Sequence, residues 1–290
     1  MRKQHGTQGE HRQIGHPTSE PRLAPCCQRQ TDTIGYEPFG RHARWVRAPT
    51  AKPALSCCTP LLQTVRVPLT RVIVGAIAFL LAGLQYLAAE TVSAAVFTPE
   101  YDYARNYISD LGVADCGTVY SGREICSPLA ALMNVGFIAD GALFFIGSVL
   151  LATLFTGALK YVFLGAALLH GIGNVIVGLF DETTPAVGAA PSIHVVGALL
   201  AILFGNVAAV LAGASALRHR WRALGVAGIT LGTLGIVSLV MLGFMGAGLP
   251  EGLVERFSVY PITASEILFG TTILVIARSR RTARYPRVDS

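Results

Sequence analysis

Long apolar stretches dominate the chain after residue 71, and each contains at most one ionisable side chain. About 20 helical residues cross the hydrocarbon core of a bilayer, and only a helix satisfies the backbone polar groups of a single segment in lipid. The stretches lack the polar stripe that helices of a soluble bundle carry. The pattern therefore predicts an all-α fold, an integral membrane bundle of six transmembrane helices. The expected spans are 72–89, 129–155, 161–180, 193–217, 223–246 and 257–277.

The first 65 residues follow neither a helical nor a strand period. They hold scattered arginines, histidines and prolines, and they cannot bury enough apolar area to offset the entropy of ordering. We therefore expect a disordered basic cytoplasmic tail at 1–65, a six-helix transmembrane domain at 66–280 and a short basic cytoplasmic tail at 281–290. The first tail either touches anionic lipid or is inert, and we favour the inert tail. A further interpretation is that translation starts after this stretch, so that residues 1–65 are not part of the protein.

Composition supports a membrane protein and excludes several soluble classes. Hydrophobic residues make up 52% and charged residues 14% of the chain, whereas a soluble domain has about 25% charged residues. The net charge of +6 is spread in patches between apolar runs, which argues against nucleic-acid binding. We therefore expect membrane lipids as partners, no nucleic acid and no cofactor.

Arginine and lysine are distributed unequally between the loops. Most lie next to the first span, in the loops after the second and fourth spans, and after the last span. The positive-inside rule then predicts a multi-pass protein of the cell membrane with both termini cytoplasmic. Cys116 and Cys126 fall in the long loop after the first span, on the outer side, where an oxidising environment permits a disulfide between them.

Three ionisable residues lie near the expected midplane, each in a different span. They are Asp140, His170 and Glu266, and Asn174 shares a helix face with His170. One interpretation is a proton or cation relay through the bundle. The other, which we favour at this point, is a histidine–carboxylate hydrogen bond with one neutral acid that holds helices together. No metal site is expected, because the chain lacks tandem histidine spacing within a helix.

A second polar cluster is expected at the outer mouth of the bundle, apart from the midplane residues. One interpretation is structural, with Asp110 or Asp181 capping a helix or pairing with Arg256. The other is a site that binds a cation or a lipid head group, or performs acid/base chemistry around His194. We favour the structural interpretation. The candidate residues are Asn106, Ser109, Asp110, Asp181, His194, Glu255, Arg256 and Tyr260.

Five stretches carry a family resemblance. They are NYISDLG at 106–112, SPLAALMNVG at 127–136, GNVIVGLFD at 173–181, HVVGALLAILFGN at 194–206 and GLVERFSVYP at 252–261. Together they resemble the prokaryotic polytopic membrane family known as domain of unknown function nine-nine-eight. The resemblance implies a compact helical membrane domain of about six spans and no established reaction. The chain departs from the family pattern after Phe180, where Asp181 follows directly and a proline usually stands.

Three functions remain open from the sequence. The first is a non-enzymatic membrane protein that binds a lipid head group or cation at the outer mouth. The second is a small proton-coupled transporter that uses Asp140, His170 and Glu266, although the two halves of the chain show no internal repeat. The third is a membrane-embedded lipid hydrolase, although no motif of known catalytic mechanics is present, so we expect no catalytic residue. Glycine-rich helix faces such as Gly228-x-x-x-Gly232 allow close helix approach, and we favour tight packing within the bundle, with oligomerisation as the alternative.

Overall fold

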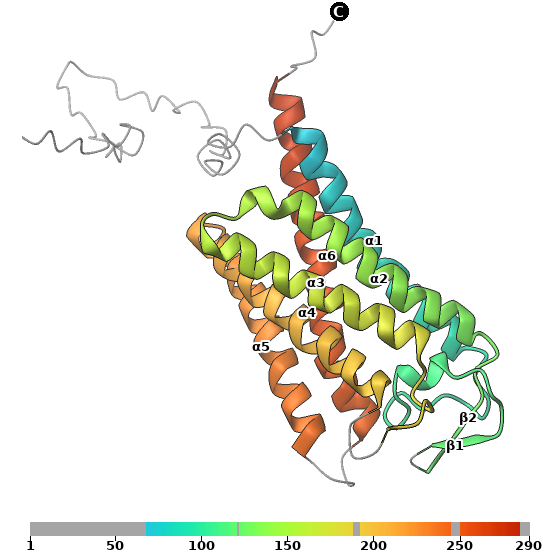
Figure 1. Cartoon of the computed structure of the whole chain (residues 1–290). Coiled ribbons are helices and arrows are strands. Elements are labelled where there is room, and N and C mark those ends of the chain that lie inside the picture. Colours follow the sequence, from blue (N-terminus) through green and yellow to red (C-terminus); the bar gives the residue numbers. More distant parts are fainter. Residues whose placement is uncertain (1–67, 121, 188–191, 245–249, 285–290) are drawn as a thin grey trace, which may run out of the picture. The chain divides into compact units, whose positions relative to one another are not determined.

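The computed structural model describes residues 68–120, 122–187, 192–244 and 250–284 (Figure 1). The expected disordered tail at 1–65 lies outside these residues. Within them the structure has six long helices, and all six are long and apolar enough to cross a membrane. The predicted all-α membrane bundle is therefore confirmed. The helices are α1 (Leu69–Ala94), α2 (Ala130–Leu151), α3 (Ala158–Leu179), α4 (Ile193–Arg218), α5 (Arg222–Phe244) and α6 (Glu251–Arg284).

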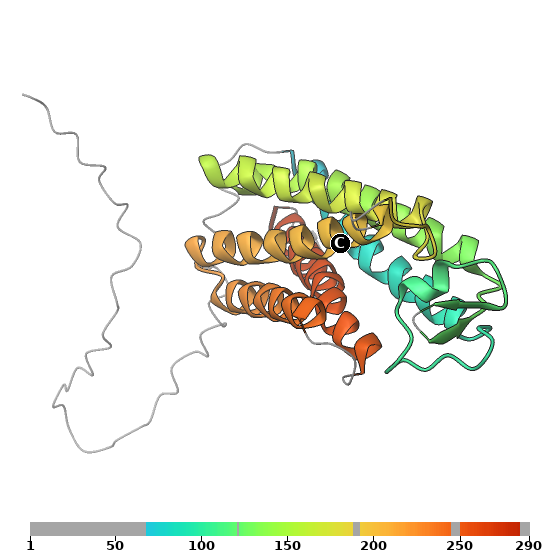
Figure 2. The same cartoon turned by 60° about the horizontal axis from the view of Figure 1, so that its bottom comes forward.

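The helices form a closed ring in which each packs against the next along the chain. In both views α3, α4 and α5 lie side by side, and α6 completes the ring by packing against α1 (Figures 1 and 2). Aromatic and aliphatic side chains fill the centre, among them Phe79, Phe144 and Phe269. Many large apolar side chains point outward instead, such as Val162 and Leu179, as expected for helices that face lipid.

The connection between α1 and α2 folds over one end of the ring, which we call the hairpin end. It contains a short 3-10 helix, η2 (Ser109–Gly112), and two antiparallel strands, β1 (Thr118–Tyr120) and β2 (Arg123–Ile125). A disulfide joins Cys116 to Cys126 at the base of this hairpin. Leu111 and Ile125 are fully buried beneath it, so the connection is packed onto the helices.

The opposite end of the ring is where α1 begins and α6 ends. We call it the arginine-rich end, because most of the basic side chains of the described residues lie at helix termini there. They are Arg71, Lys160, Arg218, Arg220, Arg222 and Arg278.

The last helix begins earlier than expected from the hydrophobic pattern. We expected a span from 257, but α6 starts at Glu251 and continues past Pro261 to Arg284. The charged residues Glu255 and Arg256 therefore lie inside the helix, and Arg256 is only 4% exposed. A charged pair such as Glu255 and Arg256 before an apolar run is typical of a loop. Here the pair lies in a helix, because both side chains form hydrogen bonds with the α1–α2 connection at the hairpin end.

The glycine pair of α5, Gly228 and Gly232, packs against α4 of the same chain. A Cβ at Gly228 would lie 3.0 Å from the Cα of Gly213, and one at Gly232 would lie 2.5 Å from the carbonyl oxygen of Asn206. Both contacts belong to α4, so these glycines let α4 and α5 approach closely. Oligomerisation through other glycine-rich faces stays a prediction.

Candidate functional site

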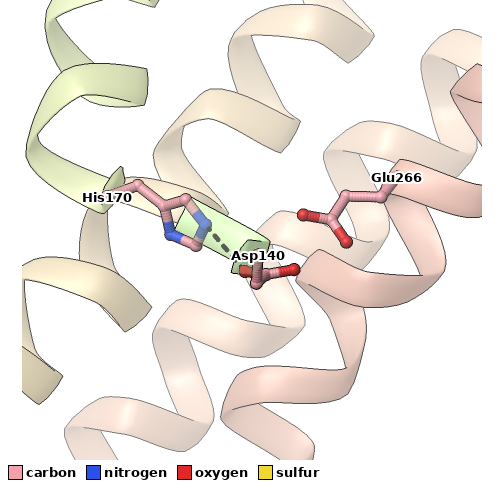
Figure 3. Close-up of side chains that lie close together, drawn as sticks. All are labelled: Asp140, His170 and Glu266. Carbon is pink, nitrogen blue, oxygen red and sulfur yellow. Dashed lines mark ion pairs between the residues drawn. The ribbon is translucent and has the colours of Figure 1, made fainter. Parts of the chain in front are cut away.

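The three ionisable residues expected near the midplane meet in the centre of the ring (Figure 3). Asp140 comes from α2, His170 from α3 and Glu266 from α6, and one ligand atom of each lies within 4.8 Å of the other two. The Nε2 atom of His170 is 3.4 Å from Oδ2 of Asp140. All three side chains are almost completely buried. We call this group the core triad.

The orientation of His170 is set by α4. Its Nδ1 atom lies 2.7 Å from the carbonyl oxygen of Ala201. A carbonyl oxygen only accepts hydrogen bonds, so Nδ1 carries the proton and donates it. The Nε2 atom is left facing Asp140, with the amide of Asn174 at 3.1 Å. The same amide lies 3.4 Å from Oδ2 of Asp140 and lines up with the triad as expected from its helix face.

The carboxyl groups of the triad are underpartnered. Oδ1 of Asp140 and both side-chain oxygens of Glu266 are buried and have no hydrogen-bond partner. Among the described residues, the ion pairs give neither acid a lysine or arginine partner, and Asp140 pairs with His170 alone. Buried polar atoms are nearly always paired in folded proteins. Several acceptor atoms without a hydrogen-bond partner therefore converge in one place.

A cavity of about 50 Å³ lies beside the triad and extends toward the hairpin end. A space of this size is large enough for water. It is lined at one end by Asp140, His170 and Asn174, and its other polar lining residues are Ser109, His194, Glu255 and Thr263. The sequence suggested two separate polar clusters, whereas the structure connects members of both through one cavity.

At the hairpin end, Asp110 and Arg123 form the centre of a polar network. Arg123 binds both carboxylate oxygens of Asp110, at 2.9 and 3.0 Å. Asn106 donates to Asp110 through its side chain at 2.7 Å, and Tyr107 donates through its backbone at 3.1 Å. The guanidinium also stacks over the Tyr107 ring, 4.2 Å from its centroid. Asp110 therefore ties the short helix η2 to strand β2.

Glu182 lies against this pair and differs from Asp110 in its pKa. Its Oε2 atom accepts a hydrogen bond from Ser109, and its Oε1 atom is 3.7 Å from Arg123. Burial, together with the nearby Asp110 carboxylate, raises the pKa of Glu182 to about 10. Burial alone would raise the pKa of Asp110 too, but Glu182, Arg123 and Asn106 together lower it below its ordinary value. The pair thus keeps one proton, on Glu182.

Arg256 is the second anchor of the connection. Its Nη1 atom donates to the backbone oxygens of Tyr103, Asn106 and Gly252, at 2.8–2.9 Å. Its Nη2 atom contacts Glu90 at 3.2 Å and the hydroxyl of Tyr101. The charge is buried and both terminal nitrogens are bound, so Arg256 joins α6 to α1 and to the loop before η2.

The remaining outer-mouth candidates each form hydrogen bonds with other residues of the chain. Asp181 accepts hydrogen bonds from the backbone and side chain of Thr183. His194 donates from Nδ1 to the carbonyl oxygen of Phe180 at 2.7 Å. Glu255 accepts from the backbone N–H of Ile108. Tyr260 donates to Glu90 at 2.9 Å.

The pairing at the outer mouth differs from the one expected. We expected Asp110 or Asp181 to pair with Arg256, but Asp110 pairs with Arg123 and Arg256 pairs with Glu90. Three of the eight candidates line the cavity, namely Ser109, His194 and Glu255. Asn106, Asp110 and Arg256 hold the connection in place. Tyr260 joins α6 to α1, and Asp181 bonds only to Thr183. Sequence reasoning missed Glu90, whose signal was an acid directly after the first apolar run.

The core triad has the donor set of a cation site. Carboxylate oxygens and a histidine nitrogen are metal ligands, and they also bind and release protons. The expectation of no metal site used histidine spacing within one helix. That criterion does not apply here, because the three groups come from three helices that are far apart in sequence.

The comparisons with known proteins agree with the resemblance found in the sequence. Residues 80–272 match the family described as Protein of unknown function (DUF998). Neither the curated proteins nor the solved structures contain a match to the chain. The matched range runs from α1 to α6 and includes the core triad and the hairpin-end network. The chain belongs to the DUF998 family, and its described residues form a membrane bundle of six long helices.

Proposed function

We propose that the protein is a small cation carrier of the cell membrane whose binding site is the core triad of Asp140, His170 and Glu266. The single observation that carries this proposal is the convergence of these groups with three carboxylate oxygens left unpartnered. Ionisable residues at membrane depth are costly, and they commonly mark the path of an ion or a substrate.

Charge balance supports cation binding. Two carboxylates in a low-dielectric interior repel each other and lose their hydration. Protons or a bound cation compensate these charges, since no lysine or arginine of the described residues pairs with them. A bound cation supplies positive charge and also uses the free oxygens as ligands.

The adjoining cavity supplies the approach to the triad. Its lining includes Ser109, His194 and Glu255 as well as Asp140 and His170, so an ion arriving from the hairpin end meets polar side chains between apolar walls. The basic residues of the opposite end favour a cytoplasmic location for that end and for both termini. The Cys116–Cys126 disulfide favours an extracytoplasmic hairpin end. Protease access to a C-terminal tag in inverted and right-side-out vesicles checks this orientation.

The geometry favours a carrier over the two other functions. A lipid head group at the outer mouth would be held by Arg256, but that guanidinium is already bound by five groups of the chain itself. A hydrolase would act at the outer mouth through His194 and Asp110. Asp110 is bound by Arg123 and does not line the cavity, so these two side chains do not share a site.

The test uses purified protein in liposomes that contain an entrapped ion-sensitive dye. Uptake of Na⁺, K⁺ and Zn²⁺ is measured in turn, for the native chain and for Asp140→Asn and Glu266→Gln. We expect uptake of at least one ion by the native chain and its loss in both variants. Both substitutions keep the shape of the side chain and remove its charge.

Glu182→Gln is the matched control, because it makes the same acid-to-amide change at a buried carboxyl outside the triad and outside the cavity. It should retain uptake. Size-exclusion profiles in detergent identify any variant that fails to fold. Native chain that transports none of the three ions, or uptake that persists in both triad variants, would contradict the proposal.

A further inference from the structure

We infer that the core triad takes a divalent transition-metal ion of the Zn²⁺ class, with Asp140, His170 and Glu266 as its ligands. The inference rests on the proposed function, since it names the cation that the carrier site selects. It also stands as a binding site by itself, because its support comes from ligand chemistry and geometry within the described residues.

The donor set separates this class from other cations. Imidazole nitrogen is a ligand for Zn²⁺, Fe²⁺, Ni²⁺ and Cu²⁺, whereas Ca²⁺ and Mg²⁺ prefer six or more oxygen ligands. The triad offers one nitrogen and two carboxyl groups. Three protein ligands with room for water are the pattern of exchangeable zinc sites, as opposed to closed structural sites with four.

The distances are compatible with one ion. Ligand atoms at about 2.0–2.1 Å in a tetrahedron lie about 3.4 Å apart. The Nε2 atom of His170 and Oδ2 of Asp140 are separated by that distance, 3.4 Å. Glu266 completes the group within 4.8 Å, and both of its oxygens lack a partner that would have to be displaced. Figure 3 shows its carboxyl group directed toward Asp140 from α6.

The surroundings of His170 are those of a metal ligand. Metal-binding histidines usually donate their second N–H to a carbonyl or carboxylate, which fixes the ring and the free nitrogen. Here Nδ1 donates to the carbonyl oxygen of Ala201 at 2.7 Å, so Nε2 is the nitrogen with the lone pair, and a metal ion would replace the Asn174 amide as its partner. The amide of Asn174 lies next to both Nε2 and Asp140 and acts as a positioning group for the carboxylate.

Charge and space also fit a divalent ion. Two carboxylates and one neutral imidazole carry two negative charges, which a divalent ion neutralises in an interior that disfavours net charge. A monovalent ion would leave one charge uncompensated. The cavity beside Asp140 and His170 has space for a water molecule as a further ligand.

The test measures binding of Co²⁺ and Zn²⁺ to the purified full-length chain in detergent, with the protein first stripped by a chelator. Co²⁺ gives a visible absorption band when nitrogen and oxygen ligands replace its water, and Zn²⁺ added afterwards should remove that band. We expect one ion per chain, with loss of the band in Asp140→Asn, His170→Gln and Glu266→Gln. Asn174→Ala should weaken the affinity by about 10–100-fold without abolishing it.

The matched control is His219→Gln. This variant removes a partly buried histidine directly after the last residue of α4, at the arginine-rich end, and should leave binding unchanged. Folded native chain that binds neither ion overturns the inference. So does a Co²⁺ band that survives all three ligand substitutions, because the ion would then bind elsewhere.

The two proposals fail in different ways. Triad-dependent uptake of Na⁺ or K⁺ without Co²⁺ or Zn²⁺ binding would overturn the metal class and leave the carrier function standing. Stoichiometric Co²⁺ binding without uptake of any ion would overturn the carrier function and leave the metal site standing.

Discussion

The backbone carbonyl of Ala201 on α4 accepts a hydrogen bond from Nδ1 of His170 on α3 and thereby decides which ring nitrogen faces the other helices. One turn further along α4, Gly205 lies against the same ring. The orientation of the imidazole is therefore a property of the α3–α4 contact, and it can be altered without changing any residue of the core triad.

Replacing Gly205 by alanine should disturb the triad through His170. A Cβ at this position would lie 2.6 Å from Nδ1 of His170 and 2.7 Å from Ile262, so the ring has to move. We expect Co²⁺ affinity to fall by about 10–100-fold, as for loss of an orienting group, with destabilisation of about 1–3 kcal/mol from overpacking. Cobalt titration followed by thermal unfolding in detergent measures both effects.

Gly165→Ala serves as the control for that substitution, because a Cβ at Gly165 meets nothing within 4 Å. This variant changes the same residue type on α3 and should bind and unfold like the native chain. Equal cobalt affinity in the two glycine variants would show that the ring position does not matter.

Replacing Arg256 by methionine should strongly destabilise the fold. The substitution leaves Glu90 buried without its cation, and loss of one partner of a buried ion pair costs about 3–5 kcal/mol. Arg105→Met should cost only about 0–1 kcal/mol, because the Arg105–Asp102 pair is exposed, with 83% and 50% of the two side chains accessible. Chemical unfolding in mixed detergent compares the two variants directly, and similar losses would refute the assignment of Arg256 as an anchor.

The stability of the hairpin end should fall as the pH rises. The pKa of Glu182 is raised from 4.5 to about 10, so between these values the folded chain binds more protons than the unfolded chain and loses stability with increasing pH. Glu182→Gln removes this proton uptake, and we expect its melting temperature to depend less on pH across that window. Parallel pH profiles for the two proteins would contradict the raised pKa.

Asp110 should act in the opposite direction and at lower pH. Its pKa is lowered, so its contribution is present above the ordinary value of 3.8 and is lost as the pH falls through the folded value. Glu182 therefore lowers the stability as the pH rises above 4.5, and Asp110 lowers it as the pH falls below 3.8. The two losses of stability are separated in pH, so a single pH profile of the melting temperature resolves both.

Removing the disulfide should loosen the hairpin that carries Arg123. Cys116 and Cys126 are ten residues apart, and closing a loop of this size stabilises a fold by about 2–3 kcal/mol. We expect a loss of that order in the Cys116→Ser, Cys126→Ser double variant, seen as a lower midpoint of unfolding. Dithiothreitol should lower the midpoint of the native chain and leave that of the double variant unchanged; an effect on both would point to another thiol.

The sequence predicted the membrane architecture well, because hydrophobic length and the absence of charge are properties of each segment alone. The six spans and the depth of Asp140, His170 and Glu266 follow from such local patterns. The start of α6 does not follow from local patterns. Arg256 occupies a buried position in this helix because Glu90 and the carbonyl groups of the loop surround its guanidinium.

Pairing between distant residues was the part that local patterns could not give. Three arginines and a larger number of acids lie near the hairpin end, and sequence spacing does not decide which of them meet. The pairing of Asp110 with Arg123 depends on the β1–β2 turn, which returns the arginine to η2. The shared cavity likewise depends on how α4 and α6 pack around His170.

The closed ring of helices has a consequence for biosynthesis. Each helix packs against the one made just before it, so insertion can proceed in the order of synthesis until α6 meets α1. The two acids of the triad lie on the second and the last helix. A nascent chain in which α6 has not yet joined the bundle therefore contains only one of these two acids in the bundle. The core triad is therefore complete only after the final span has been made.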